Sequence, residues 1–311
     1  MARSAVQNRH CLLLLGLPLA SLMALAVGCG PADSGEGKSA GGSAKSNAPL
    51  FSELPARIQK AGTISVGSSV DYPPFEYYAA DGKTLQGFEP ELAKELERQL
   101  GVTFTWNNAS FDTLFTALRS GRYDIVYGAT NDTAEREKTF DFANYLRSSQ
   151  SFVVAKGNPQ SIEKVEDICG KTVAAVRGGV QAQFLEKQSQ DCVKAGKEKV
   201  DVLTFGGNAD EQLAVKQGRA AALLENYPTA VDFAKKSGGK LELVRNLQVE
   251  QRFFGMVLTK DNTQLRDALV KAWQAVIDDG SYGKVLDKWG LAEIGVEKAG
   301  VNGANSDATG S

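Results

Sequence analysis

Hydrophobic residues follow two different spacings along this chain. Short apolar runs, typical of buried strands, alternate with segments in which apolar side chains recur every three or four residues, typical of amphipathic helices. The alternation stops near residues 157–159, starts again, and ends in two helices. Strands are predicted at residues 63–67, 102–106, 124–127, 171–176, 200–205 and 220–224, and helices at residues 90–100, 110–120, 180–194, 208–217, 261–279 and 282–289. The pattern therefore predicts an α/β protein.

The two runs of alternation predict two α/β lobes, with the chain crossing from the first to the second and back. Extended segments near Ser151–Ala155 and Arg252–Leu258 would form the two hinge crossings, and a cleft between lobes is a natural place for a small molecule. The expected organisation is a signal peptide at residues 1–28, a flexible tether at 29–50, lobe 1 at 51–154 and 251–293, lobe 2 at 155–250, and a disordered tail at 294–311.

A strand, a turn and a helix follow one another between Tyr127 and Arg136. Asp132 and Glu135 have the spacing of a capping box, which predicts that the helix begins at Asp132. Arg136 would then face the carboxyl end of the strand, where open α/β sheets bind ligands. A guanidinium group there can hold a carboxylate with two charge-assisted hydrogen bonds. The residues alone equally allow a surface arginine that pairs with Glu135 or Asp132.

Other segments carry weaker signals for a binding site. Gly178 and Gly179 precede a predicted helix, whose free N–H groups could hold an anion, although such turns also serve structural purposes. Tyr72 lies in a proline-rich loop that could form the rim of a site or a packed turn. Phe111, in the first turn of its helix, could face a ligand or the core. Asn208 and Glu211 have the spacing of a second capping box.

The amino terminus has the features of an export signal. Basic residues precede a short, interrupted apolar run, which is too short to span a membrane. The run closes on small residues and Cys29, so it resembles a lipoprotein signal in which Cys29 receives lipid; an ordinary secretory signal is the alternative. Loss of Arg3 and Arg9 with the signal would change the formal charge from −2 to about −4, which does not favour nucleic acid as a partner.

Cysteine and histidine usage restricts the chemistry. The single histidine, His10, lies in the predicted signal peptide, so the mature chain would lack Ser/His/Asp and Cys/His catalysis and histidine-ligated metals. Cys169 and Cys192 remain as one pair in an exported chain, where a disulfide is expected. Two thiols without a histidine make a poor metal site. We expect no metal and no cofactor.

A series of motifs in a fixed order resembles a known family. The motifs are Asp71-Tyr72-Pro73-Pro74-Phe75, Gly87-Phe88-Glu89-Pro90-Glu91-Leu92, Asn131-Asp132-Thr133-Ala134-Glu135-Arg136, Phe140-Asp141-Phe142, Asp167-Ile168-Cys169-Gly170-Lys171, Gly218-Arg219, Asp279-Gly280-Ser281-Tyr282 and Lys288-Trp289. Over residues 54–291 the chain resembles the polar amino-acid-binding proteins of ABC importers. That resemblance implies a two-lobed periplasmic-binding-protein type II fold with two hinge crossings.

The resemblance also implies roles for particular residues. Arg136 would hold the α-carboxylate of a ligand, and the N–H groups of Val180 and Gln181 would complete that grip from the second lobe. The Ala129 carbonyl and the Asn131 side chain would accept from the α-ammonium group. The ligand side chain would lie between Tyr72 and Phe111. Further positions expected at the site are Asn226, Ser69, Gly128, Gly179 and Glu225.

Three positions depart from the family pattern. Asn131 stands where a serine or threonine is usual, and Gly179-Val180 replaces a pair of hydroxyl residues at the carboxylate turn. Asn226 stands where an aspartate usually pairs with the ammonium group; Glu225 could supply the charge, but neighbouring strand residues point to opposite faces. Ser69 argues mildly against lysine or arginine as ligands, whereas Glu76 and Glu225 keep them possible.

The leading hypothesis is a lipid-anchored solute-binding protein, monomeric and facing the outside or the periplasm. It would bind a small polar amino acid or related zwitterion and deliver it to the membrane permease of an ABC importer, without catalysing a reaction. One alternative is an enzyme on the same fold, similar to cyclohexadienyl dehydratases, with Glu225 as general acid. Another is a ligand sensor without a transport role.

Overall fold

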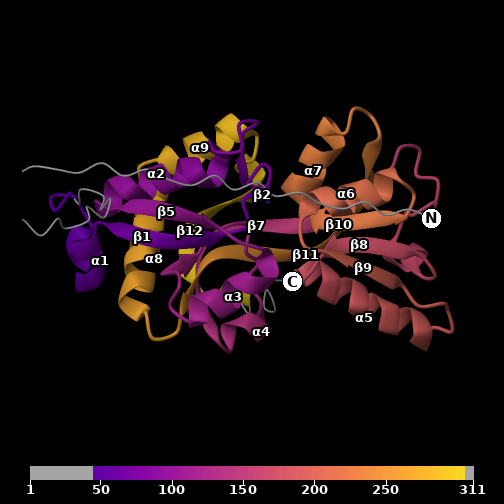
Figure 1. The fold of residues 1–311 in the computed structure, drawn as a ribbon, viewed down its shortest axis with the longest axis horizontal. Helices are drawn as coiled ribbons and strands as arrows, with labels where there is room; N and C mark the ends of the chain where they lie inside the picture. The colour runs from indigo at the N-terminus through magenta and orange to yellow at the C-terminus, as the bar shows by residue number, and fades with distance from the viewer. Residues whose placement is uncertain (1–44, 305–311) are drawn as a thin grey trace, which may run out of the picture. The chain divides into compact units, whose positions relative to one another are not determined.

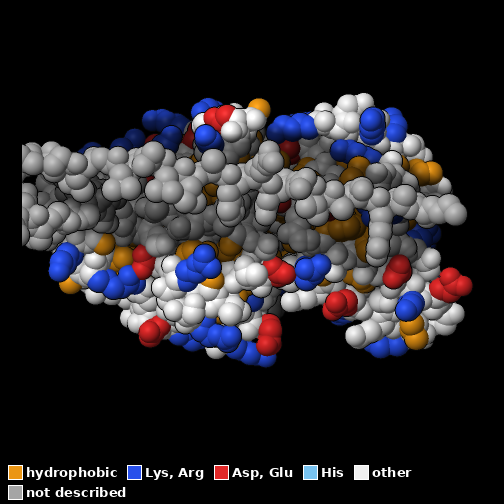
Figure 2. Space-filling view, in the orientation of Figure 1, with side chains coloured by type: hydrophobic (Ala, Val, Ile, Leu, Met, Phe, Trp, Pro, Cys, Tyr) orange, Lys and Arg blue, Asp and Glu red, His pale blue; other side chains and the backbone are white. Residues whose placement is uncertain are grey.

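The computed structural model describes residues 45–304. The predicted signal peptide, Cys29 and most of the predicted tether lie outside the described residues. No helix among residues 45–304 is both long and apolar enough to cross a membrane. The face shown in Figure 2 carries both basic and acidic side chains.

Most of the strands belong to one large mixed sheet with the order β5-β1-β6-β11-β7-β10-β8-β9. Its first lobe contains α1 (Ala56–Ala61), β1 (Thr63–Ser68), α2 (Phe88–Leu100), β5 (Thr103–Asn108), α3 (Phe111–Arg119), β6 (Ile125–Val126) and α4 (Ala134–Glu137), with a small separate sheet of β2 (Asp71–Tyr72), β3 (Glu76–Tyr78) and β4 (Leu85–Gln86). Its second lobe contains β8 (Thr172–Val176), α5 (Val180–Lys194), β9 (Asp201–Phe205), α6 (Asn208–Lys216), β10 (Ala222–Asn226) and α7 (Tyr227–Lys236).

Two long antiparallel strands, β7 (Phe140–Ala155) and β11 (Leu241–Thr259), run through both lobes (Figure 1). β6 pairs with the carboxyl-terminal part of β11, and β10 pairs with the carboxyl-terminal part of β7. The chain then returns to the first lobe as α8 (Thr263–Asp278), α9 (Ser281–Trp289) and β12 (Gly295–Val301). The predicted crossings at 151–155 and 252–258 thus lie within much longer strands.

Separate hydrophobic clusters fill the two lobes. In the first lobe, α2, α8 and α9 cover the sheet over a core in which the buried Tyr145 and Trp273 rings stack with centroids 4.5 Å apart. In the second lobe, buried side chains from α5 and α7 lie on clusters built around β8 and β10. Each cluster removes apolar surface from water, which is the main favourable term in folding.

Both predicted capping boxes are wrong. Helix α4 begins at Ala134, and the Thr133 hydroxyl caps it by accepting from the Arg136 N–H at 3.1 Å. Asp132 cannot serve as the cap, because its carboxylate accepts instead from the Asn144 amide and the Gly303 N–H. The second box fails at α6, whose N-cap is Gly207. There the Glu211 side chain is buried and forms a hydrogen bond with Glu225 instead of returning to the helix end.

The ends of the described chain are more ordered than the sequence predicted. Within the expected tether, the Lys45 and Leu50 N–H groups donate to carbonyls at the end of α2. Within the expected tail at 294–311, β12 pairs with β7, and the Asn302 side chain binds the Phe142 N–H and the Asp141 carboxylate. This segment is ordered because the free edge of β7 offers hydrogen bonds that local composition does not reveal. Residues 305–311 lie outside the described residues.

Cys169 and Cys192 form the predicted disulfide, with their Cα atoms 5.7 Å apart and 23 residues apart in sequence. The bond ties the end of a short 3₁₀ helix (Val165–Ile168) to the last turns of α5. Cys192 is buried in the cluster on that side of the sheet.

Removal of this disulfide should destabilise the protein. Closing a loop of this length lowers the entropy of the unfolded chain, which raises its free energy by about 3 kcal/mol. We expect the double variant Cys169→Ser/Cys192→Ser to unfold at lower urea concentration than the oxidised wild type, as followed by circular dichroism. Wild-type protein in reductant serves as the control and should match the variant. Equal midpoints for the variant and the oxidised wild type would contradict the prediction.

Candidate functional site

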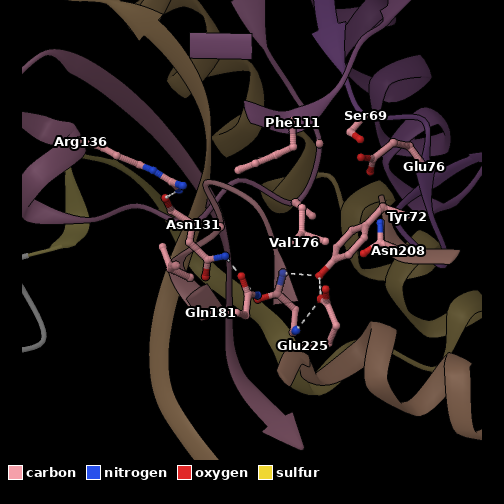
Figure 3. A pocket seen from close by; sticks show the side chains of 15 residues that line it. Ser69, Tyr72, Glu76, Phe111, Asn131, Arg136, Val176, Gln181, Asn208 and Glu225 are labelled. Carbon is pink, nitrogen blue, oxygen red and sulfur yellow. Dashed lines mark hydrogen bonds between the residues drawn. The ribbon is translucent and has the colours of Figure 1, made fainter. Parts of the chain in front are cut away.

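A cavity of about 40 Å³ lies where the two lobes meet. All twelve positions that the sequence assigned to ligand binding line it, and Glu76, Val176 and Asn208 join them (Figure 3). The lining residues are Ser69, Tyr72, Glu76, Phe111, Gly128, Ala129, Asn131, Arg136, Val176, Gly179, Val180, Gln181, Asn208, Glu225 and Asn226. The first lobe supplies the residues before position 140, and the second supplies the others.

The loop from Gly128 to Arg136 forms one wall of the cavity. Ala129 has a φ of 38°, in the left-handed region, and Gly128 has a φ of 149°. Strand β11 fixes this unusual path, because the Asp132 N–H donates to the Phe253 carbonyl at 2.8 Å and the Gly255 N–H donates to the Thr130 carbonyl at 3.1 Å. A rigid sheet thus supports an irregular loop.

Arg136 points toward the cavity and lies over aromatic rings. Its guanidinium group donates to the Asn131 carbonyl at 2.7 Å and, across the lobes, to the Gly178 carbonyl at 3.1 Å. Its central carbon lies 4.7 Å from the centroid of the Phe115 ring and 5.6 Å from that of Phe111. Of the two alternative partners, Glu135 pairs instead with Lys138, and the Asp132 carboxylate accepts from Asn144 and Gly303.

The surroundings of Arg136 favour an added negative charge. Burial and the nearby positive charge of Arg252 lower the pKa of Arg136 to about 10, and the Asp132 carboxylate opposes that shift. Asp132 itself is buried, which raises its pKa to about 7. An incoming carboxylate would restore solvation to the guanidinium group through charge-assisted hydrogen bonds.

The amino end of α5 faces the cavity from the second lobe. Gly179 is the N-cap and offers no side chain to the first turn, so Val180 and Gln181 bring free N–H groups to this wall. The positive end of a helix of fifteen residues lies here, which favours anions. A Cβ atom on Gly179 would lie 2.8 Å from the Gln181 Oε1 atom, so glycine leaves room for that side chain.

Asn226 joins the two lobes through its side chain. Its amide oxygen accepts from the Asn131 amide at 3.3 Å and from the Gln181 amide at 3.2 Å. Its amide nitrogen donates to the Tyr72 hydroxyl at 2.7 Å. Asn226 is therefore engaged by protein groups, whereas the Oδ1 atom of the buried Asn131 has no partner.

Glu225 and its neighbour Asn226 both line the cavity, although adjacent strand residues should point to opposite faces. Asn226 is the last residue of β10 and the N-cap of α7, so the backbone turns there and both side chains reach the cleft. Tyr72 donates to the Glu225 carboxylate from the other lobe. Burial raises the pKa of Glu225 to about 7, and the hydrogen bond from Tyr72 opposes the shift.

Glu76 places a carboxyl group at another wall of the cavity. Its side chain is buried and receives no donor at its Oε2 atom, and burial together with the charge of Glu89 and a hydrogen bond to it raises the pKa of Glu76 well above the usual range. A Cβ atom on Gly128 would lie 2.4 Å from the Glu76 Oε1 atom, so this carboxyl group adjoins the start of the loop that ends in Arg136. Figure 3 shows Glu76 beside Ser69, away from Arg136.

The three lining residues outside the predicted set had different signals in the sequence. Glu76 directly follows the aromatic loop, so its position was visible but its direction was not. Asn208 was assigned to a helix cap, and its nearness to Asp71 and Glu225 arises only in the fold. Val176 ends β8 just before the Gly-Gly turn, which places it at the wall without any chemical signal.

The sequence matches the family of bacterial extracellular solute-binding proteins, family 3, over residues 64–292. The arginine-binding protein ArgT of Corynebacterium glutamicum is 28% identical over 251 residues, covering 80% of this chain and 81% of that protein. The L-cystine-binding protein TcyJ of Escherichia coli is 31% identical over 239 residues, covering 76% of this chain and 86% of that protein.

The structure is similar to that of an ancestral arginine-binding protein bound to arginine. The TM-score is 0.67 and the sequence identity 31%, over 73% of this chain and 98% of that one. The fold is therefore the two-lobed periplasmic-binding-protein type II fold that the motifs implied. With the family match covering most of the chain, this protein belongs to the bacterial extracellular solute-binding proteins of family 3.

Proposed function

We propose that this protein is the amino-acid-binding component of an ABC importer and that it holds an α-amino acid in the cavity between its lobes. The observation that carries the proposal is the pairing of Arg136 with the amino end of α5 across one cavity. Relatives whose names state that they bind arginine or L-cystine support the same ligand class. These relatives are binding proteins, and we assign Glu225 no catalytic role.

The ligand carboxylate would lie between Arg136 and the first turn of α5. Arg136 would donate from its guanidinium group, and Val180 and Gln181 would donate through their backbone N–H groups. A guanidinium group and a helix amino terminus both favour negative charge, so the two lobes would gain a shared partner when the cleft holds a carboxylate.

The α-ammonium group would lie next to the Asn131 side chain. Its buried Oδ1 atom has no partner, and the backbone carbonyl of the same residue accepts from Arg136, so the two groups belong to neighbouring parts of one wall. The Ala129 carbonyl would be a second acceptor. Asn226 would act indirectly, because its hydrogen bond from the Asn131 amide nitrogen leaves the Asn131 oxygen free to face the ligand.

The ligand side chain would extend between Tyr72 and Phe111 toward Glu76. Both rings line the cavity, so the methylene groups of a long side chain would be covered. At its end, the buried carboxyl group of Glu76 favours a cationic group, because a positive charge beside it would stabilise its ionised form. We therefore propose an amino acid with a basic side chain of the arginine type, despite Ser69.

The placement of the protein follows from its predicted signal. We propose that Cys29 carries lipid and that residues 29–44 tether a monomer to the membrane face outside the cytoplasm, next to the permease. We also propose that lobe 2 covers residues 155–250 and that lobe 1 covers residues 51–154 together with the return from 251, which continues past the expected end at 293 to include β12. The two long strands that join the lobes support these boundaries.

Replacement of Arg136 should weaken amino-acid binding strongly. Two charge-assisted hydrogen bonds, at about 1.5 to 3 kcal/mol each, would be lost. We expect Arg136→Ala to raise the Kd for L-arginine at least about 100-fold, as measured by isothermal titration calorimetry. Arg119→Ala, at an exposed position at the end of α3, is the matched control and should bind as the wild type does. An unchanged Kd in Arg136→Ala would refute the carboxylate assignment.

Neutralising Glu76 should alter the choice of side chain. We expect Glu76→Gln to weaken L-arginine binding about tenfold, corresponding to about 1.4 kcal/mol for the lost charge pair. Binding of L-glutamine, which brings no side-chain charge, should change less than about threefold. The measurement is the ratio of the two dissociation constants. If both ligands weaken equally, Glu76 has a structural role and does not select charge.

The lipid anchor can be tested by cell fractionation. We expect wild-type protein in the membrane fraction, labelled by radioactive palmitate, and Cys29→Ala in the soluble exported fraction or as uncleaved precursor. Cys29→Ser serves as a second variant that cannot form the thioether. Palmitate label on either variant would contradict lipidation at Cys29.

A further inference from the structure

At the cavity wall, Glu225 forms a pair of buried carboxyl groups with Glu211. Both side chains are at most 1% exposed, and they are hydrogen-bonded to each other. Glu225 lines the cavity, whereas Glu211 does not. A hydrogen bond between two carboxyl groups requires a proton, because two carboxylates can only accept.

The hydrogen bonds around the pair show which group keeps its negative charge. Glu225 accepts from the Tyr72 hydroxyl and, at 3.0 Å, from the Asn226 N–H. These donors stabilise an ionised Glu225. No donor reaches the Oε2 atom of Glu211, and burial and the charge of Glu225 raise the pKa of Glu211 well above the usual range. Glu211 is therefore the member that carries the proton, and its O–H group donates a hydrogen bond to the Glu225 carboxylate.

Contacts from the first lobe strengthen the need for that proton. Asp71 accepts from the Asn208 N–H at 3.3 Å and so occupies the amino end of α6, the helix that carries Glu211. A Cβ atom on Gly207 would lie 2.7 Å from the Asp71 carboxylate, so glycine permits this approach. The charges acting on the pair come from Asp71 and from the two glutamates themselves, and all are negative.

The elements that touch the pair belong to both lobes. Tyr72 and Asp71 come from β2 in the first lobe, while Glu211 on α6 and Glu225 on β10 belong to the second. The Asn208 amide lies between them, and its nitrogen can donate to Glu225 at 3.2 Å and to Glu211 at 3.3 Å. Bringing the lobes together therefore adds a negative charge and removes water from the pair.

We propose that Glu211 and Glu225 share one proton when the lobes are in contact, so that closure of the cleft over a ligand is linked to proton uptake. This inference rests on the proposed function. Closure raises the affinity of the pair for the proton, so binding is favoured below the pKa of the closed pair and is lost as the pH rises through it. The loss is at most tenfold in Kd for each pH unit and each proton.

The test compares wild type with Glu211→Gln and Asp210→Asn. Glutamine keeps the donor to Glu225 without a titrating proton. Asp210 is the exposed neighbour on the same helix, so its variant controls for the loss of one negative charge. Dissociation constants for L-arginine and L-glutamine are measured by calorimetry from pH 6.5 to 8, in two buffers of different ionisation enthalpy, which reports the protons taken up.

For wild type and Asp210→Asn, we expect the Kd of each ligand to rise more steeply with pH than for Glu211→Gln. Wild type should also take up more protons per bound ligand than Glu211→Gln does, and the difference should approach one proton. Equal pH profiles and proton counts for wild type and Glu211→Gln would overturn the proposal. Any proton released from Glu76 by a cationic ligand is common to all three proteins and cancels in the comparison.

If no amino acid binds to the wild type, the proposed function fails and the proton pair is tested separately. Urea unfolding of the unliganded protein then gives the free energy of unfolding from pH 5 to 8. A raised pKa in the folded state contributes stability at low pH that is lost as the pH rises. Wild type and Asp210→Asn should lose stability over this range more steeply than Glu211→Gln. Equal slopes would overturn the shared proton.

Discussion

The pairing of β7 with β11 is the interaction on which the rest of the structure depends. Each strand belongs to both lobes, and their register is interrupted between Leu243 and Gln248 and again between Val249 and Arg252. Beyond Arg252, β11 holds the loop that carries Arg136, whereas β7 pairs with β10 from Gln150 onward. The cavity lies between these regions, so the same strands that connect the lobes also set the distance between its walls.

Regular elements were predicted well because their signals are local. The helix at 180–194 has the predicted bounds, since a Gly-Gly turn precedes it and its apolar residues follow the helical period. The two capping boxes failed for a shared reason. Each box has the right spacing, but one of its acidic residues is bound elsewhere in the fold. Gly303 donates to Asp132 of the first box, and Glu225 forms a hydrogen bond with Glu211 of the second. Residue spacing cannot report a partner that only the fold supplies.

The candidate site likewise combines features that local sequence predicts with contacts that only the fold supplies. The turn at 127–136 and the family motifs were enough to name residues that line the cavity, but not to say which are already engaged by the protein. Asn226 bridges the lobes and leaves the Asn131 oxygen unpartnered, whereas the sequence suggested direct contact with a ligand. Glu225 reaches the cleft because the backbone turns at the end of β10, an exception to strand alternation that requires the structure.

The β12 strand has a practical consequence for protein production. Residues 295–301 pair with the β7 edge in the first lobe, beyond the end of the family match at residue 292. A shortened protein that stops at that boundary would expose unpaired backbone groups on a central strand, and such edges promote aggregation. It would also remove the Gly303 donor from Asp132, beside the loop of Arg136. Purification tags are therefore better placed after residue 304 than in exchange for this segment.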